Sequence, residues 1–300
     1  MFLPSNLHLS IEDLLKNSNY KELISSSTHI TDLYREGGSL VREDDLLTYL
    51  TVRLPATYAA IYTVFREIPF RVGSLLDLGA GPGTGWWAAR EIWGTLDATL
   101  VEKETSFAKL GKKLGCPDYV LGDVEKIRSY KPHDLALFGY ILGELGELNL
   151  EAVWEAAACV AIVEPGTPRG FQKMLAARDK LIQLGGHVLA PCPHSKACPH
   201  PKWCHFSVRV ARTFLHRQAK QASLPYEDEK FSYVIVTKKP LNRGIPRIIS
   251  TSQKRSGHVN LHVCAPSGIE DLTISKKEKE RYKEARKAKW GDLFDPFKST

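Results

Sequence analysis

The stretch LLDLGAGPG (residues 75–83) runs from an apolar strand into a glycine-rich loop, and a helix begins near Thr84. Its form is D-x-G-x-G-x-G. The glycines permit a tight turn and a close approach of a ligand to the backbone, and the start of the helix offers free N–H groups. A dinucleotide-binding loop would instead read G-x-G-x-x-G. The sequence therefore predicts a cofactor site of another kind.

Around this loop, from Val72 to Gly186, short apolar strands alternate with helices. This alternation is typical of an α/β fold with a parallel, doubly wound sheet. Residues 207–219 predict a further helix. The predicted domains are an N-terminal helical cap (1–70), an α/β domain (71–239) with a Cys-rich insertion (190–206), a small β unit (240–275) and a basic C-terminal helix and tail (276–300).

Two acids follow the next strand ends. Glu102 lies nineteen residues beyond Gly83, and Asp123 ends the third strand. A carboxylate at the position of Glu102 can accept both hydrogen bonds of a ribose diol. Each acid alone could equally be a surface residue or a helix cap. The loop with Asp77 before it resembles motif I of class I S-adenosylmethionine-dependent methyltransferases, and the two later acids support that resemblance. The predicted cofactor-binding residues are Asp77, Gly79, Ala80, Gly81, Pro82, Gly83, Glu102 and Asp123.

A catalytic motif is missing after the fourth strand. Amino methyltransferases carry an Asn/Asp-Pro-Pro-Tyr/Phe segment there, whereas residues 137–144 read LFGYILGE. Tyr140 and Glu144 could line a substrate pocket or serve only as a sheet-edge residue and a helix cap. No catalytic residue is assigned, and an enzymatic activity is left open.

Positive charge is concentrated in the C-terminal half. The formal net charge is +7, and residues 230–269 contain seven Lys/Arg and no Asp/Glu. A one-sided block of this kind favours a polyanion partner over a merely solvated basic face. The predicted phosphate-binding residues are Lys238, Lys239, Arg243, Arg247, Lys254 and Arg255.

Three of the six cysteines crowd into thirteen residues: Cys192, Cys198 and Cys204. Their spacing is neither the C-x2-C of a zinc ribbon nor the C-x2-C-x2-C of a bacterial ferredoxin, but it still favours a metal or cluster site. The fourth ligand could be Cys264 or a histidine. Four thiolates would suit a [4Fe–4S] cluster or zinc. The candidate histidines are His194, His200 and His205, and the remaining cysteines, Cys116 and Cys159, are expected to be packing residues of the core.

Several motifs together resemble a class I methyltransferase-like family of small-ribosomal-subunit assembly proteins, found in bacteria and mitochondria. They are RLPATY (53–58), the glycine loop, the cysteine segment 192–206, YEDEKFSY (226–233), KR-x-GHV (254–259) with Cys264, and ARK-x2-WGD (285–292). The resemblance implies a methyltransferase-like fold, an OB-like β unit, contact with the rRNA and a [4Fe–4S] cluster. By position its ligands would be Cys192, Cys198, Cys204 and Cys264.

These observations predict an S-adenosylmethionine-binding protein that binds the rRNA of the small ribosomal subunit and supports its assembly or translation. The cluster would join the cysteine loop to the β unit. An active rRNA methyltransferase and a zinc-stabilised RNA-binding module without cofactor are the alternatives. The first fifteen residues lack a signal or transit pattern, and no apolar run is long enough for a membrane helix. We therefore expect a cytoplasmic, bacterial form with neither membrane nor DNA as a partner.

Overall fold

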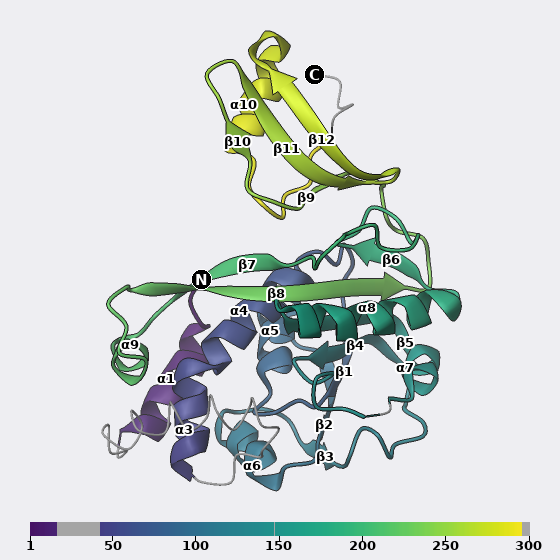
Figure 1. Cartoon of the computed structure of the whole chain (residues 1–300). Helices are drawn as coiled ribbons and strands as arrows, with labels where there is room; N and C mark the ends of the chain where they lie inside the picture. The colour runs from purple at the N-terminus through teal and green to yellow at the C-terminus, as the bar shows by residue number, and fades with distance from the viewer. Residues whose placement is uncertain (17–42, 147, 296–300) are drawn as a thin grey trace. The chain divides into compact units, whose positions relative to one another are not determined.

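The computed structural model describes residues 1–16, 43–146 and 148–295. The chain divides into two compact units, each discontinuous in sequence. The first comprises Met1–Val163 with Val208–Glu229, and the second comprises Glu164–Ser207 with Lys230–Thr300. Figure 1 labels their helices and strands. The four-part domain division drawn from the sequence stays a prediction.

The larger sheet is mostly parallel and has the strand order β3-β2-β1-β4-β5-β8-β6, with β7 paired to β8. Its parallel strands are β1 (Ser74–Leu78), β2 (Asp97–Glu102), β3 (Tyr119–Leu121), β4 (His133–Gly139) and β5 (Ala157–Pro165). Because β2 and β4 pair with opposite sides of β1, the strand order reverses at β1. Open α/β sheets bind ligands beside the carboxyl ends of their strands at such a reversal. The predicted parallel α/β sheet is confirmed.

The helices of the first unit are α1 (Ser5–Leu15), α3 (Glu43–Val52), α4 (Leu54–Phe65), α5 (Thr84–Trp93), α6 (Thr105–Lys113), α7 (Leu150–Ala156) and α9 (Phe214–Ala219). Pro55 lies in the first turn of α4, where its missing N–H breaks no helical hydrogen bond. It therefore starts a helix next to the end of α3. Residues 17–42 of the predicted cap lie outside the described residues. None of the described helices is long and apolar enough to cross a membrane.

The second unit carries helix α8 (Pro168–Gln183) and strand β6 (His187–Ala190), which pairs antiparallel with β8 (Tyr226–Thr237). Its own smaller sheet has four strands: β9 (Arg247–Ile248), β10 (Gln253–Lys254), β11 (His258–Ala265) and β12 (Gly268–Ser275). β11 lies inside this sheet and pairs with the other three. The 3-10 turn η1 (Lys276–Glu278) and helix α10 (Lys279–Lys287) follow.

Alternating residues of β11 build the core of the small sheet. Val259, Leu261 and Val263 are fully buried and pack with Tyr282 and Ala285 of α10. The spacing of two along the strand and of three along the helix places each apolar set on one face. The predicted C-terminal helix therefore has a packing role on its apolar side, whatever its charged side contacts.

One sequence prediction is wrong. Residues 207–219 do not form a single helix: β7 (Phe206–Ala211) pairs with β8, and only Phe214–Ala219 is helical. Phe206 and Val210 are buried while Ser207 and Arg209 are exposed, which is the two-residue alternation of a strand. The Thr213 hydroxyl then accepts the His216 N–H at 3.2 Å and caps the short helix.

Candidate cofactor crevice and cysteine-lined cavity

The glycine loop leaves the carboxyl end of β1 at the reversal of strand order. Gly79, Gly81 and Gly83 all have positive φ, at 70°, 53° and 83°, the left-handed region that favours glycine. A Cβ at Gly79 would meet Ile141 at 1.9 Å and one at Gly83 would meet Cys116 at 2.3 Å, whereas at Gly81 nothing lies within 4 Å. The loop is therefore packed from behind at two glycines and open at the middle one.

Two of the predicted acids stand beside this loop. Glu102 Oε2 accepts the Gly81 N–H at 2.8 Å, and Oε1 accepts the Glu104 N–H at 2.9 Å. Asp77 is 2% exposed and its Oδ2 has no hydrogen-bond partner among the described residues. Burial, followed by the nearby Glu102, raises the pKa of Asp77 to about 7, against a hydrogen bond from the Trp86 backbone. The strand that leads into the loop thus carries a buried carboxyl oxygen without a partner among the described residues, which is a feature that calls for an explanation.

The third acid lies at the same edge of the sheet. Leu121 is the register partner of Glu102, and Asp123 follows two residues later. Its Oδ1 accepts the Glu125 N–H at 3.1 Å, and Oδ2 lies 3.6 Å from Lys126 Nζ. Strand pairing therefore places Asp123 two residues beyond the register partner of Glu102. The contacts that Asp123 makes are those of a residue that caps a turn.

A polar contact that was not predicted lies at the end of β4. Tyr140 has a φ of 61°, uncommon for a residue with a side chain, and its hydroxyl donates to Glu229 Oε1 at 2.9 Å. The guanidinium of Arg53 lies 3.9 Å from Glu229 Oε2 and 6.0 Å from the Tyr140 ring centroid. Glu144, the other predicted pocket residue, is exposed. The sequence offered one signal: Arg53 and Glu229 lie in motifs quoted above without a role.

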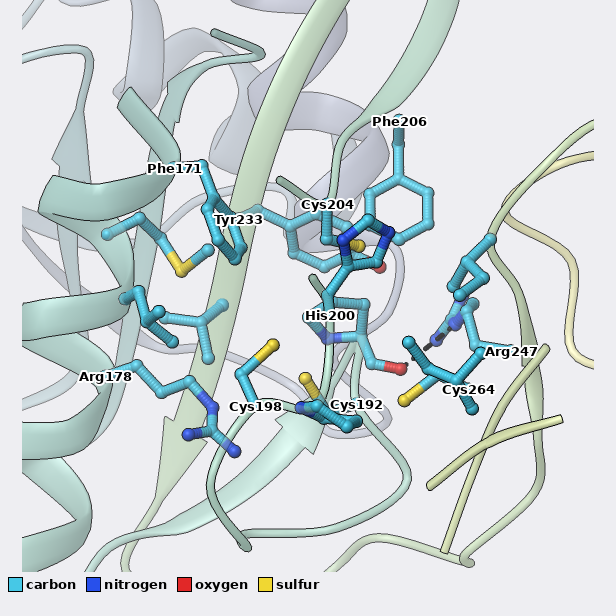
Figure 2. A pocket seen from close by; sticks show the side chains of 17 residues that line it. Phe171, Arg178, Cys192, Cys198, His200, Cys204, Phe206, Tyr233, Arg247 and Cys264 are labelled. Atoms are coloured by element: carbon cyan, nitrogen blue, oxygen red, sulfur yellow. Dashed lines mark hydrogen bonds between the residues drawn. The ribbon is translucent and has the colours of Figure 1, made fainter. Parts of the chain in front are cut away.

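The second unit contains a cavity lined by all four predicted ligand cysteines (Figure 2). The volume of this cavity, with its opening to solvent, is about 540 Å³. Cys192 follows β6, Cys198 and Cys204 belong to the same loop, and Cys264 lies on β11. Cys264 therefore lines the same cavity as the three loop cysteines, and so does His200, so both stay candidates for the fourth ligand.

Backbone contacts hold the cysteine loop in place. The Asn242 side-chain amide donates to the carbonyls of Val188, Leu189 and Cys192 at 3.0, 3.0 and 2.7 Å. The Ser232 hydroxyl donates to the Cys204 carbonyl at 2.7 Å. Because these carbonyls are satisfied by neighbouring segments, the positions of Cys192 and Cys204 are fixed by the fold of the unit.

The histidines weighed as fourth ligands differ in position. His200 lines the cavity, and His194 Nε2 lies 3.8 Å from Cys264 Sγ. His205 is absent from the lining and stacks on Trp203, with ring centroids 5.6 Å apart. Its ring also meets Trp290 edge-on at 4.7 Å. The structure thus keeps His194 and His200 near the thiols and gives His205 an aromatic packing role.

Burial favours the protonated form of two thiols in this cavity, those of Cys204 and Cys264. Burial and the neighbouring Cys192 and Cys198 raise the pKa of Cys264 to about 12, and burial also raises that of Cys204 far above its ordinary value. Within the described ranges, no group of three or more His, Cys, Asp or Glu side chains could hold a single metal ion as it stands. Metal binding at this place would have to release protons from the thiols.

Two arginines that were not predicted at this place also line the cavity. Arg178 is 1% exposed and Arg247 is 4% exposed. Arg247 donates to the carbonyls of Pro191 at 3.2 Å and Gly291 at 2.8 Å. A signal for Arg178 existed in α8, where it shares the buried helical face of Phe171 and Met174 at spacings of seven and four.

The predicted phosphate-binding residues divide into two groups. Lys238, Lys239, Arg243, Lys254 and Arg255 are exposed. Arg247 is not, because its guanidinium is buried against backbone carbonyls. The assignment of Arg247 to an RNA surface is therefore withdrawn, and the other five stay candidates for phosphate contact.

Comparison with known proteins gives a family match over most of the chain. A model of the family described as "Mitochondrial small ribosomal subunit Rsm22" matches residues 43–295. The human "Ribosome assembly protein METTL17, mitochondrial" is 29% identical over 94% of this chain and 68% of its own length. The Saccharomyces cerevisiae "Ribosome assembly protein RSM22, mitochondrial" is 28% identical over 79% of this chain and 65% of its own length. The chain thus spans about two thirds of the length of these relatives.

Methyltransferases are among the solved structures that the chain resembles in fold. The plantazolicin methyltransferase BpumL, solved with SAH, is 11% identical, with a TM-score of 0.41 over 73% of this chain and 98% of that one. A TehB-like SAM-dependent methyltransferase from Corynebacterium glutamicum is 15% identical, with a TM-score of 0.40 over 74% and 100%. The α/β fold with a mostly parallel central sheet is given by the strand order of the chain itself.

The mitochondrial relatives correct the prediction about localisation. The sequence was expected to belong to a cytoplasmic, bacterial form, but the human and yeast relatives are mitochondrial proteins. The expectation rested on the missing leader pattern in the first fifteen residues, and an absent pattern does not fix a compartment.

Proposed function

Since the chain belongs to the Rsm22 family of mitochondrial small ribosomal subunit proteins, we propose that it is an assembly protein that binds the rRNA of the small subunit. The observation that carries the proposal is the extent of the family match, residues 43–295, which takes in both the crevice and the cysteine-lined cavity. Relatives of this chain are themselves ribosome assembly proteins. We propose that three features serve this role: a cofactor site, a metal centre and an RNA-binding surface.

Binding of S-adenosylmethionine is the first part. The open side of Gly81, the unpartnered Asp77 Oδ2 and the Glu102 carboxylate at the strand end support it. Gly79, Ala80, Pro82 and Gly83 would shape the loop, and Asp123 would stand at the same sheet edge. When bound, this cofactor supplies an electrophilic methyl group. The chain's own residues would bind and orient it, and the segment 137–144 offers no amino-methyltransferase motif to use it.

A four-cysteine metal centre is the second part. Cys192, Cys198, Cys204 and Cys264 line one cavity, which fits the four thiolates that a [4Fe–4S] cluster requires. Four thiolates would also suit zinc, which binds sulfur at about 2.3 Å. We choose the cluster because the family resemblance implies it. It would join the loop after β6 to strand β11.

Contact with rRNA is the third part. Five exposed Lys/Arg residues lie within 238–255, and the whole stretch 230–269 carries no carboxylate. Lys254 ends β10, and the Arg255 N–H bonds the His258 carbonyl at 2.9 Å, which fixes the turn that displays both side chains. Phosphate binding by such a surface is sequence-independent and sensitive to salt.

The test uses the full chain, reconstituted without oxygen, and separated small and large mitochondrial ribosomal subunits. We expect it to sediment with small subunits and not with large ones, and to be released as salt rises. Equal sedimentation with both, or with neither, would contradict the assembly role. Labelled S-adenosylmethionine added to the same mixture distinguishes the active rRNA methyltransferase, because only that alternative transfers label to rRNA.

A further inference from the structure

The arginine in the middle of α8 is a buried cation whose charge is only partly matched. The Arg178 side chain is 2% exposed, and an ion pair joins its Nη1 to Asp179 Oδ1 at 2.6 Å, where Asp179 is 48% exposed. Its Nε is buried and has no hydrogen-bond partner in the described part of the chain. A buried charge is stable only when an opposite charge compensates it, so the missing compensation has to be sought in the cavity that Arg178 lines.

No carboxylate of the described residues lines that cavity. Its lining contains four cysteines, two arginines and one histidine as chemically active groups, and neither Asp nor Glu. In the view of Figure 2 the cysteines lie between Arg178 and Arg247. The groups in this lining that would become anionic when a metal binds are therefore the thiols.

Arg178 also holds the loop between the first two cysteines. Its Nη2 donates to the Lys196 carbonyl at 2.6 Å and to the His194 carbonyl at 3.4 Å. Lys196 in turn donates from Nζ to the Pro266 carbonyl at 3.1 Å, just after the strand that carries Cys264. Arg178 thus binds the loop between Cys192 and Cys198, and Lys196 of that loop in turn binds the segment that follows Cys264.

We propose that Arg178 is the charge-compensating and positioning residue of a tetrathiolate metal centre formed by Cys192, Cys198, Cys204 and Cys264. The inference rests on the proposed function, which places a metal centre there, but not on the choice of metal. Four thiolates carry four negative charges, and either Zn²⁺ or an oxidised iron–sulfur core of charge 2+ cancels two of them. The remaining negative charge is what the buried guanidinium meets.

The charge argument predicts a direction for the reduction potential. Adding one electron to an iron–sulfur core makes the centre more negative, so a fixed positive charge nearby stabilises the reduced form more than the oxidised form. Removing that charge should make reduction harder. A residue that only braces the loop would change metal retention but leave the potential of the retained centre unchanged.

The experiment compares wild-type protein with Arg178→Met, which keeps the length of the side chain, and Arg178→Lys, which keeps its charge. Arg169→Met, at an exposed arginine near the start of the same helix, is the matched control. Each protein is reconstituted without oxygen, and its iron, sulfide and zinc contents, its rate of metal loss to a chelator and its midpoint potential are measured. Thermal melting with and without metal checks that each variant folds.

We expect Arg178→Met to lose metal about tenfold faster and to have a more negative potential, by about 59 mV if the reduced-to-oxidised ratio also changes tenfold. Arg178→Lys should keep a near wild-type potential, and Arg169→Met should match wild type in every measurement. If Arg178→Met does not fold, an altered potential in Arg178→Lys decides against the charge role and an unchanged one supports it.

Two outcomes overturn the inference alone: unchanged potential and retention in Arg178→Met, or equal loss of metal in both Arg178 variants with no change of potential. In a protein that holds only zinc, the comparison of the two variants takes the place of the potential: faster metal loss in Arg178→Met but not in Arg178→Lys supports the charge role, and equal loss in both overturns it. A wild-type chain that takes up neither iron nor zinc would instead overturn the proposed metal centre, and the role of Arg178 with it.

Discussion

Glu102 Oε2 accepts the backbone N–H of Gly81 at 2.8 Å, so the acid at the end of β2 holds the middle glycine of the loop that follows β1. Glu102 is 6% exposed and also accepts the Glu104 N–H. The acid predicted to bind a ribose therefore has a second task. It sets the position of the one loop glycine whose Cβ side is empty, and it keeps lone pairs for a ligand because each carboxylate oxygen can accept more than one hydrogen bond.

Gly81→Ala should remove S-adenosylmethionine binding. It should lower the free energy of unfolding by about as much as the same substitution at a matched glycine, Gly115. Both Gly81 and Gly115 have positive φ, 53° and 87°, and neither has an atom within 4 Å of an added Cβ. The backbone penalty of each substitution is therefore similar, about 1–2 kcal/mol. Only at Gly81 would the new methyl group occupy the space of the cofactor.

Calorimetry measures the binding, and urea unfolding measures the stability of both variants. Gly115→Ala is the control and should bind as wild type does. Wild-type affinity in Gly81→Ala would place the cofactor elsewhere. Absence of binding in the wild-type protein itself would mean that the fold persists without its ligand.

Asp77 gives the protein without cofactor a pH dependence of known sign. Burial and Glu102 raise the pKa of Asp77 to about 7 from an ordinary 3.8. The folded state therefore favours the protonated acid. Its contribution to the free energy of unfolding is complete below the ordinary pKa and is lost as pH rises through about 7.

Urea unfolding of wild type and Asp77→Asn at about pH 5 and about pH 8 tests this sign. Wild type should lose more stability between the two than the variant, whose amide does not titrate. Burial also raises the pKa of Glu102, so the variant keeps part of the dependence, and the difference between the two proteins isolates Asp77. Equal losses in both proteins would show that Asp77 ionises at its ordinary pKa.

The sequence predicted the sheet and the crevice because their signals are local. The strand, loop and helix around residues 75–93 are contiguous, and a parallel sheet places successive strand ends at one edge. The positions of Asp77 and Glu102 at neighbouring strands of one sheet can therefore be predicted from the local sequence alone. The segment 207–219 misled because its composition also suits a helix, and pairing with β8 overrides that preference.

The cysteine cavity was only half predictable. Three cysteines share one loop, but Cys264 lies sixty residues beyond Cys204 on a strand whose register pairs it with Arg247. Such a register depends on strand pairing across the small sheet and is absent from any local pattern. For the same reason the sequence predicts Arg247 on a basic surface, although it is buried. Arg178 differs, because the buried face of α8 is a local pattern that includes it.

RNA binding should lose salt dependence when two exposed cations are removed. Lys254 and Arg255 are both exposed. Each phosphate contact contributes about 0.7–0.9 to the slope of log affinity against log salt, so replacing both residues with Ala should flatten the slope by about one to two. Fluorescence anisotropy with small-subunit rRNA fragments over a range of salt measures it. Lys112 and Lys113, exposed on α6 outside the basic block, supply the control double variant. A slope that falls only in the control would move the interface to the first unit.

Cys192, Cys198, Cys204 and Cys264 should act as one set. A cluster held by thiolates needs every ligand, so single Cys→Ser changes at any of the four should lower iron and sulfide content together. They should also destabilise the second unit, because metal binding is coupled to folding. Cys116 and Cys159 are 6% and 0% exposed and lie in the first unit. Their Ser variants are the matched controls, with some loss of stability but unchanged iron.

The neighbouring histidines make this prediction decisive. His200 lines the cavity, and His194 Nε2 lies 3.8 Å from Cys264 Sγ, so either could replace Cys264 as a ligand. Iron and sulfide assays after anaerobic reconstitution should show full loss in Cys264→Ser and near wild-type content in His194→Ala and His200→Ala. The reverse pattern, with iron kept in Cys264→Ser and lost in one histidine variant, would make that histidine the fourth ligand. A zinc content of one per chain in place of iron would leave the four-thiolate set intact but change the metal, since a site of four cysteine thiolates binds either.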